Sequence, residues 1–344
     1  MAITARQWLI LLSVQFTTIL FGLTATSVTV ILPQLKGALS ATQDQVSAVG
    51  LAVALAAATV AAVGGVARAD STRYWPPIAE TATGSWSPGR IVWAELLTLD
   101  VGTAAEFYGK VFGWTFETYG PKDDFKTYTL VLAGGTPIGG MVYARPKQPE
   151  KYPSSRWVGF VSVEDVAAAA ARAEQAGGRV VIKPTELGER GTEALLMDPE
   201  GGLFGLIRTA GGDPPDLVAA DDQWLWAELW AADAAKMSAF YRDVGRYDVV
   251  DGAVQGEGGG YRLGSGGYAR AGILKRPASV PTTWLPYVRV KSVADTTARA
   301  VAAGAKVVME PARMHGTQVA VMLDPTGAPF AVAEWPPAPA GEQK

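Results

Sequence analysis

Apolar and polar positions alternate along several short stretches of the chain and return at helical spacing in others. Starting at residue 91, IVWAELLTLD alternates as a strand does, and Asp100 suits the N-cap of a helix with the sequence VGTAAEFYGKVFG. WTFETY, TYTLVLAGG and PIGGMVYA follow as short β-rich segments that Gly, Pro and Asp turns separate. The pattern therefore predicts a β-α-β-β-β unit.

The same order of elements then returns along the chain. WVGFVSV predicts a strand, EDVAAAAARAEQAGG a helix, and RVVIKPTEL, TEALLMD and LFGLIRT three more strands. Beyond the turn-rich, acidic residues 210–222, WLWAELWAAD matches IVWAELLTLD. Further matching pairs are Phe-Tyr at 107–108 and 240–241, Trp157 and Trp284, and Asp-Pro-x-Gly turns at 198–201 and 324–327. Matches in one order predict an internal duplication.

Two uncharged runs precede the repeat. The first, 7–35, is longer than the roughly 20 residues that cross a bilayer, and predicts a membrane span over 8–35. The second, 45–67, ends in ARA and an aspartate, which is typical of a signal peptidase site with cleavage after residue 69. It lacks the basic segment of an export signal, so a second membrane helix is the alternative. We expect residues 1–70 to be an anchor or leader and 71–89 a linker.

Residues 24–49, TATSVTVILPQLKGALSATQDQVSAV, resemble the first membrane helix and following loop of major facilitator superfamily drug transporters. The resemblance covers about 45 residues, and one or two spans cannot enclose a substrate path. We therefore interpret this region as an anchor or leader, or as a fusion or start-site artefact. With one span, or with cleavage, the soluble domains face outwards; with two spans they face the cytoplasm. We expect a membrane-anchored or exported protein with extracytoplasmic domains.

Composition narrows the chemistry. The chain of 344 residues has a formal charge of -3 and no basic run, so nucleic acid is not an expected partner. It has no cysteine, which excludes disulfides, thiolate nucleophiles and cysteine-held metals. The single histidine is His315.

The repeated features together resemble the vicinal oxygen chelate superfamily, the glyoxalase, bleomycin-resistance and extradiol-dioxygenase group. They are the strand-Asp-helix start with Phe-Tyr on the helix, the aromatic-led strand that opens each second unit, and the Asp-Pro-x-Gly turn. WAEL, FGW and PIGGM are similar to a tandem glyoxalase-like antigen and hydroxylase subgroup. The resemblance implies an α+β fold with two domains, each a pair of βαβββ modules in a curved open sheet, after one or two hydrophobic helices. The expected ranges are 90–209, linker 210–222, 223–336 and tail 337–344.

Metal-dependent members of this superfamily place His or Gln on the first strand, His at the start of the second module and Glu on the last strand. Carried over by spacing, these positions fall on Trp93, Trp157 and Gly205, and in the second domain on Trp226, Trp284 and Ala331. Indole offers only an N–H donor, and Gly and Ala offer no side-chain donor. The sequence therefore predicts no metal and no other cofactor.

Each WAEL strand brings a glutamate close to a tryptophan. Alternation puts Trp93 and Glu95 on one face, with Val92 on the other, and the same holds for Trp226 and Glu228. One interpretation is core packing, with each glutamate paired to an arginine. The other is an apolar cleft where the tryptophan stacks on a ring and the carboxylate takes a hydrogen bond or a proton.

Two further side chains are candidates for ligand binding. Arg190 could pair with a carboxylate or hold an anion, and the alternative is a solvated loop charge. His315 could bind a ligand, and the alternative is a residue at a loop or strand end.

The leading hypothesis is a metal-independent protein that binds a small, partly apolar molecule through Trp93, Trp157, Arg190, Trp226, Trp284 and His315. The alternative is an enzyme of the same fold, a lyase, isomerase or hydroxylase-like protein, that uses Glu95 or Glu228 as general acid or base. Because tandem domains can pair within one chain, a monomer is expected.

Overall fold

A computed structural model describes residues 75–79, 82–120, 127–144, 155–251, 260–278, 280–314 and 316–335. The chain divides into two units, 1–69 and 70–344, and the described residues belong to the second. The predicted spans over 8–35 and 45–67 and the transporter-like segment lie outside the described residues. In the part of the chain that the structure describes, no helix is long and apolar enough to cross a membrane.

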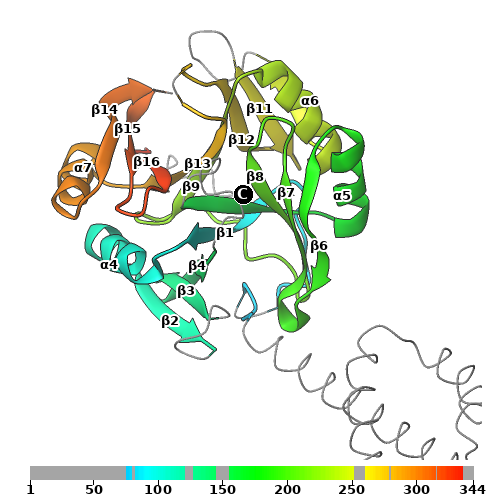
Figure 1. Cartoon of the computed structure of the whole chain (residues 1–344), viewed down its shortest axis with the longest axis horizontal. Helices are drawn as coiled ribbons and strands as arrows, with labels where there is room; N and C mark the ends of the chain where they lie inside the picture. The colour runs from blue at the N-terminus through cyan, green and yellow to red at the C-terminus, as the bar shows by residue number, and fades with distance from the viewer. Residues whose placement is uncertain are drawn as a thin grey trace, which may run out of the picture. The chain divides into compact units, whose positions relative to one another are not determined.

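The first domain is an eight-stranded sheet with a helix in each half (Figure 1). Its elements are β1 (Ile91–Thr98), α4 (Val101–Phe112), β2 (Thr115–Tyr119), β3 (Tyr128–Ala133), β4 (Thr136–Tyr143), β5 (Arg156–Ser162), α5 (Val166–Gln175), β6 (Arg179–Glu186), the 3-10 turn η1 (Gly188–Arg190), β7 (Gly191–Met197) and β8 (Leu203–Thr209). The strand order is β2-β3-β4-β1-β5-β8-β7-β6. Two βαβββ modules therefore meet where β1 pairs with β5 in antiparallel fashion.

The second domain repeats this plan. Its elements are β9 (Trp224–Ala231), α6 (Ala234–Gly245), β10 (Asp248–Asp251), β11 (Gly260–Ser265), β12 (Tyr268–Lys275), β13 (Thr283–Arg289), α7 (Val293–Ala302), β14 (Lys306–Met314), β15 (Thr317–Leu323) and β16 (Pro329–Ala333). The order is β10-β11-β12-β9-β13-β16-β15-β14, and the strands again form one open, curved sheet. The predicted α+β fold of paired modules is confirmed.

Local sequence sets the ends of the helices. Asp100 caps α4 by accepting a hydrogen bond from the Thr103 amide at 2.9 Å, and Asp165 and Asp233 cap α5 and α6 in the same way. Helix α4 ends at Gly113, whose φ of 70° lies in the left-handed region that glycine adopts without strain. The aspartate after each WAEL strand therefore starts the helix that follows it.

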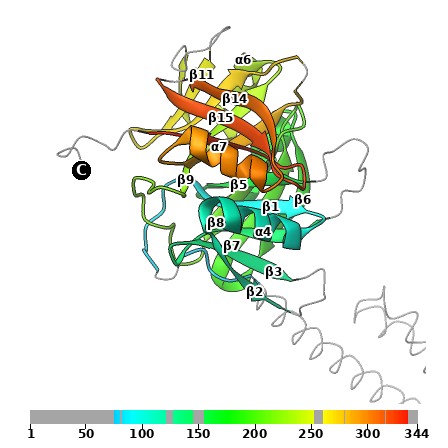
Figure 2. The same ribbon diagram turned by 90° about the vertical axis from the view of Figure 1, so that its left-hand side faces the viewer.

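The helices pair across the boundary between the two domains. Helix α4 contacts α7, and α5 contacts α6, as Figure 1 shows; Figure 2 shows α7 beside α4. One apolar core joins the first module to the fourth, and a second core joins the second module to the third. The helix-bearing faces are thus buried against each other, which leaves the concave face of each sheet as the place for a ligand.

A buried hydrogen-bond chain connects the domains at the first core. Tyr108 of α4 donates to Asp324 Oδ2 at 3.0 Å, and Trp157 Nε1 donates to the Tyr108 hydroxyl oxygen at 2.7 Å. Asp324 also accepts from the Ala328 amide within its own turn. Burial raises the pKa of Tyr108 well above its usual value, so the hydroxyl stays a donor.

The second core contains an equivalent chain of hydrogen bonds, in which the tyrosine and the tryptophan come from the second domain and the aspartate from the first. Tyr241 of α6 donates to Asp198 Oδ2 at 2.9 Å, and Trp284 Nε1 donates to the Tyr241 oxygen at 2.9 Å. The repeated Phe-Tyr pair, Asp-Pro-x-Gly turn and strand-leading tryptophan therefore form the joint between the domains. This is a physical reason for a duplicated chain to carry them twice.

Candidate functional sites on the concave faces

Strand β1 carries a bulge that changes which side chains reach the concave face. Its register with β5 shifts between Ile91 and Trp93, and both Val92 and Trp93 pack in the concave cluster of the first domain. The prediction that Val92 lies on the other face is therefore wrong. Glu95 is opposite Val158, another member of that cluster, so the predicted concave position of Trp93 and Glu95 is what the structure shows.

The strand-leading tryptophans lie on the opposite face. Trp157 pairs with Leu96, and both belong to the core beneath the helices, while Trp284 pairs with Leu229 in the other such core. Because opposed residues of antiparallel strands point the same way, neither tryptophan faces a cleft. The predicted placement of Trp157 and Trp284 with the cleft residues is wrong: Trp93 pairs with Phe160 and Trp226 with Tyr287, three residues further along each strand, and a shift by an odd number of residues reverses the face.

The first concave face centres on a buried ion cluster. Arg190 has no exposed side-chain surface, and its Nη1 lies 2.7 Å from Glu95 Oε1 and 3.4 Å from Glu193 Oε1. Tyr128 of β3 donates to the same Glu95 oxygen at 2.9 Å, and Trp93 Nε1 donates to the Tyr128 hydroxyl at 3.0 Å. The first interpretation of the sequence, a glutamate paired to an arginine, describes this domain.

The cluster holds two carboxylates around one cation. Burial raises the pKa of Glu193 to about 8, against the pull of Arg190 towards the ionised form. Glu193 is the more distant carboxylate partner of Arg190, at 3.4 Å against 2.7 Å for Glu95, so the charge of Arg190 offsets the burial of Glu193 only in part. At neutral pH the cluster is one ion pair beside a neutral acid, and it offers little unbalanced charge for acid-base chemistry.

Aromatic rings surround the guanidinium group. Its carbon lies 4.5 Å from the ring centre of Tyr128, 5.4 Å from Trp93 and 5.3 Å from Trp75. Trp75 belongs to residues 75–79, which precede the sheet and lie against its concave face. Ile78 of that segment is 3% exposed and packs in the concave cluster. The first cleft is therefore filled by the chain itself.

The second concave face carries a different polar set. Glu228 of β9 accepts from Tyr287 at 2.6 Å through Oε2 and from Trp226 Nε1 at 3.2 Å through Oε1. Burial, followed by the charge of Glu228, raises the pKa of Tyr287 well above its usual value, so the phenol remains a donor. Trp226 is only partly buried, unlike Trp93 of the first domain, which is 2% exposed.

The sequence did not single out Tyr128, Glu193 or Tyr287, which complete the two polar sets. Each lies on a strand position that alternation alone leaves open to either face, so only register reveals it. Arg190 is buried in the first cluster rather than solvated, while His315 lies outside the described residues.

The side chains at the superfamily's ligand positions do not suit a chelated divalent ion. Across the sheet, Trp93 pairs with Phe160, and Phe160 pairs with Gly205. In the second domain the corresponding row is Trp226, Tyr287 and Ala331. Indole, benzyl and methyl groups donate no electron pair to such an ion, and a lone phenol held by Glu228 is a poor ligand. Among the described residues, no group of three or more His, Asp or Glu side chains could hold a metal.

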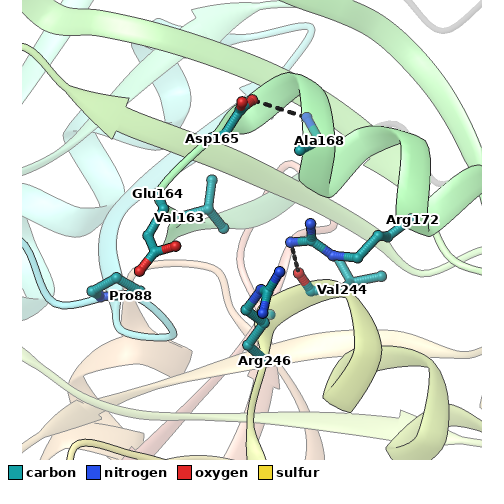
Figure 3. A pocket seen from close by; sticks show the side chains of 9 residues that line it. Pro88, Val163, Glu164, Asp165, Ala168, Arg172, Val244 and Arg246 are labelled. Carbon is teal, nitrogen blue, oxygen red and sulfur yellow. Dashed lines mark hydrogen bonds between the residues drawn. The ribbon is translucent and has the colours of Figure 1, made fainter.

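A small cavity lies away from both concave faces, at the seam between α5 and α6 (Figure 3). Its volume is about 90 Å³, and it is bordered by Glu164, Arg172 and Arg246. Arg172 donates to the Val244 carbonyl at 3.1 Å, which ties the domains together. A space of this size holds a few water molecules and not a ring compound.

Comparison with known families agrees with this architecture. Residues 90–206 match the Glyoxalase/Bleomycin resistance protein/Dioxygenase superfamily, and residues 226–333 match the Glyoxalase-like domain. The chain therefore carries two tandem glyoxalase-like domains of the vicinal oxygen chelate superfamily. Neither match extends to the transporter-like segment near the amino terminus, and that resemblance gains no support.

Two named relatives match this chain over most of their own length. The chain is 29% identical over 251 residues to "Putative glyoxylase CFP32" of Mycobacterium tuberculosis, covering 72% of this chain and 94% of that protein. It is 27% identical over 267 residues to "Anthracycline biosynthesis protein DauV" of Streptomyces sp. (strain C5), with the same coverage. An extradiol ring-cleaving dioxygenase from B. fuscum is 12% identical with a TM-score of 0.51, covering 75% of each chain. At that identity the likeness shows the fold alone.

Proposed function

We propose that this protein binds a small, partly apolar molecule without a metal, and that the second concave face is its working site. The observation that carries the proposal is the difference between the two faces. In the first, Glu95 is neutralised by Arg190 and covered by residues 75–79. In the second, Trp226 is partly exposed beside the carboxylate of Glu228.

The lining of the second face defines the ligand. Its wall is formed by apolar side chains, among them Leu225, Leu285, Val319, Val321, Met309 and Met314. Glu228 accepts hydrogen bonds from Tyr287 and Trp226, and a carboxylate can also accept one from a donor on a molecule that binds beside it. A flat ring that stacks on Trp226 and carries one hydroxyl or amine towards Glu228 fits both features.

The names of two relatives support a small organic ligand. One is named a glyoxylase and the other an anthracycline biosynthesis protein, so both names refer to small organic molecules. The lining described above favours a ring compound over a small dicarbonyl, because the apolar wall is long and the ligand positions lack metal donors.

The test is calorimetric titration of the full chain with 2-naphthol, a flat ring system with one hydroxyl donor. Trp226→Ala removes the stacking surface and is expected to weaken binding at least tenfold, which corresponds to about 1.4 kcal/mol. The matched control is Trp335→Ala, since Trp335 is 47% exposed and belongs to neither cleft cluster. Equal affinities for both variants and the parent would contradict the proposal.

An enzyme that uses Glu228 as acid or base is the second candidate. The observation in its favour is the short, buried contact between Glu228 and Tyr287 at 2.6 Å, which could exchange a proton with a bound substrate. Glu228→Gln keeps the shape of the site and removes the proton acceptor. Conversion of a ring substrate by the parent, lost in this variant while binding persists, would favour the enzyme; binding without conversion would favour the binding protein.

A further inference from the structure

Residues 75–79, WPPIA, make contacts in the first cleft that a ligand would make. The ring of Trp75 lies 5.2 Å from that of Tyr128 and faces the Arg190 guanidinium. The Pro76 carbonyl accepts a hydrogen bond from Arg190 Nε at 3.0 Å, and Ile78 fills the apolar part of the face. The segment precedes residues 90–206, which match the superfamily, so it is an addition to the domain.

One edge of the guanidinium is left incomplete by this arrangement. Glu95 and Glu193 both approach Nη1, on the far side from Pro76. Nη2 is buried and makes no hydrogen bond to the described residues. A buried donor without an acceptor is unfavourable by about 1–3 kcal/mol, so the segment is an imperfect occupant of its own site.

A carboxylate would complete that edge. The Nε and Nη2 hydrogens of arginine are parallel and match the two oxygens of a carboxylate in a bidentate pair. The neutral Pro76 carbonyl has one oxygen and satisfies only Nε. A ligand with a flat ring in place of Trp75 and a carboxylate in place of the Pro76 carbonyl would therefore keep the contacts of these two residues with Arg190 and add a hydrogen bond to Nη2.

We propose that residues 75–79 are a removable strap over a second binding site, and that this site takes a planar aromatic carboxylate on the Nε–Nη2 edge of Arg190. The strap and the ligand exclude each other, so the ligand shifts the chain towards the open form. This site lies in the first domain and takes a carboxylate at Arg190, whereas the proposed function places a hydrogen-bond donor at Glu228 of the second domain. Either can fail while the other stands.

The absence of cysteine makes strap opening directly measurable. In the full chain, Ile78→Cys creates the only thiol, and its reaction rate with a maleimide reports the exposure of the strap. Pro77→Cys gives the reaction rate of an exposed thiol in the same segment. Val158→Cys gives the reaction rate of a fully buried thiol in the sheet beneath it, because Val158 is 0% exposed. If residues 75–79 open, Ile78→Cys should react at least ten times faster than Val158→Cys. Equal rates would show a fixed part of the core and overturn the proposal.

The ligand is tested in the same assay with naphthalene-2-carboxylate, and 2-naphthol serves as the ring without the carboxylate. The carboxylate is expected to raise the rate of Ile78→Cys severalfold and to leave that of Val158→Cys unchanged, while 2-naphthol has no effect on either. A rate unchanged by the carboxylate would overturn the assignment of the ligand.

An independent measurement avoids the thiol at position 78. Calorimetry with Trp75→Ala should show naphthalene-2-carboxylate binding at least tenfold tighter than to the parent, because the competing ring is gone. Trp335→Ala, an exposed tryptophan outside both clefts, should match the parent. A Trp75→Ala protein that folds with the parent's affinity would overturn the proposal.

Discussion

Substituting Glu193 by glutamine should make the protein more stable at neutral and alkaline pH. Glu193 is 7% exposed, and burial raises its pKa to about 8 from an ordinary 4.5. The folded chain therefore keeps a proton on this carboxyl that the unfolded chain releases. The stability contributed by that retained proton is complete below pH 4.5 and is lost as the pH rises through 8.

The size of the stability gain follows from the difference between the pKa of Glu193 in the folded chain and its pKa in the unfolded chain. One retained proton changes the unfolding free energy by about 1.4 kcal/mol per pH unit. Glutamine has the shape of the protonated acid and does not titrate. Between pH 5 and pH 7.5, the stability advantage of Glu193→Gln over the parent should therefore grow by about 3 kcal/mol.

The assay is urea unfolding of the full chain, followed by far-ultraviolet circular dichroism at pH 5, 6, 7 and 7.5. Glu186→Gln is the matched control, because Glu186 is an exposed glutamate on the neighbouring strand β6. Its curve should run parallel to that of the parent. If the Glu193→Gln curve also runs parallel, Glu193 is ionised in the folded protein and the description of the cluster is wrong.

Three further results are expected from the buried contacts. Arg190→Met leaves two buried carboxylates without their cation and should lower the unfolding free energy by about 3–5 kcal/mol at pH 8, with part recovered below pH 5; no pH dependence of the loss would contradict this. Tyr108→Phe and Tyr241→Phe each remove a donor from the joint and should lower stability by about 1–3 kcal/mol in urea unfolding, whereas an effect in only one would contradict equivalent joints. Gly140→Ala, whose Cβ would overlap the β3 tyrosine, should lower the melting temperature, while the helical Gly102→Ala should not.

Much of the architecture could be predicted because its signals are local. The repeat of WAEL, the capping Asp100 and the Asp-Pro-x-Gly turns each act within a few residues, and together they indicated the order of strands and helices. The bulge near Val92 and the face of Trp157 depend on strand register, which the sequence does not show. Register is decided by the packing of whole sheets, so the assumed spacing was wrong by three residues in each domain.

The candidate sites were less predictable for a related reason. Glu95 and Arg190 were both proposed from the sequence, but their ion pair spans 95 positions and depends on how η1 folds over the sheet. The contact of Arg190 with Pro76 spans 114 positions and comes from a stretch that composition marks only as linker. Long-range contacts of this kind arise from the closed fold and leave no local pattern.

The most direct test of the account is metal analysis of the purified full chain, combined with thermal melts after chelation and after addition of Ni²⁺, Mn²⁺, Fe²⁺ or Zn²⁺. Since Trp93 and Trp226 stand at the first ligand positions of the two clefts, we expect no stoichiometric metal and no shift in melting temperature. A bound metal in stoichiometric amount, or a melting temperature raised by several degrees, would contradict metal-independent binding and indicate a chelate enzyme.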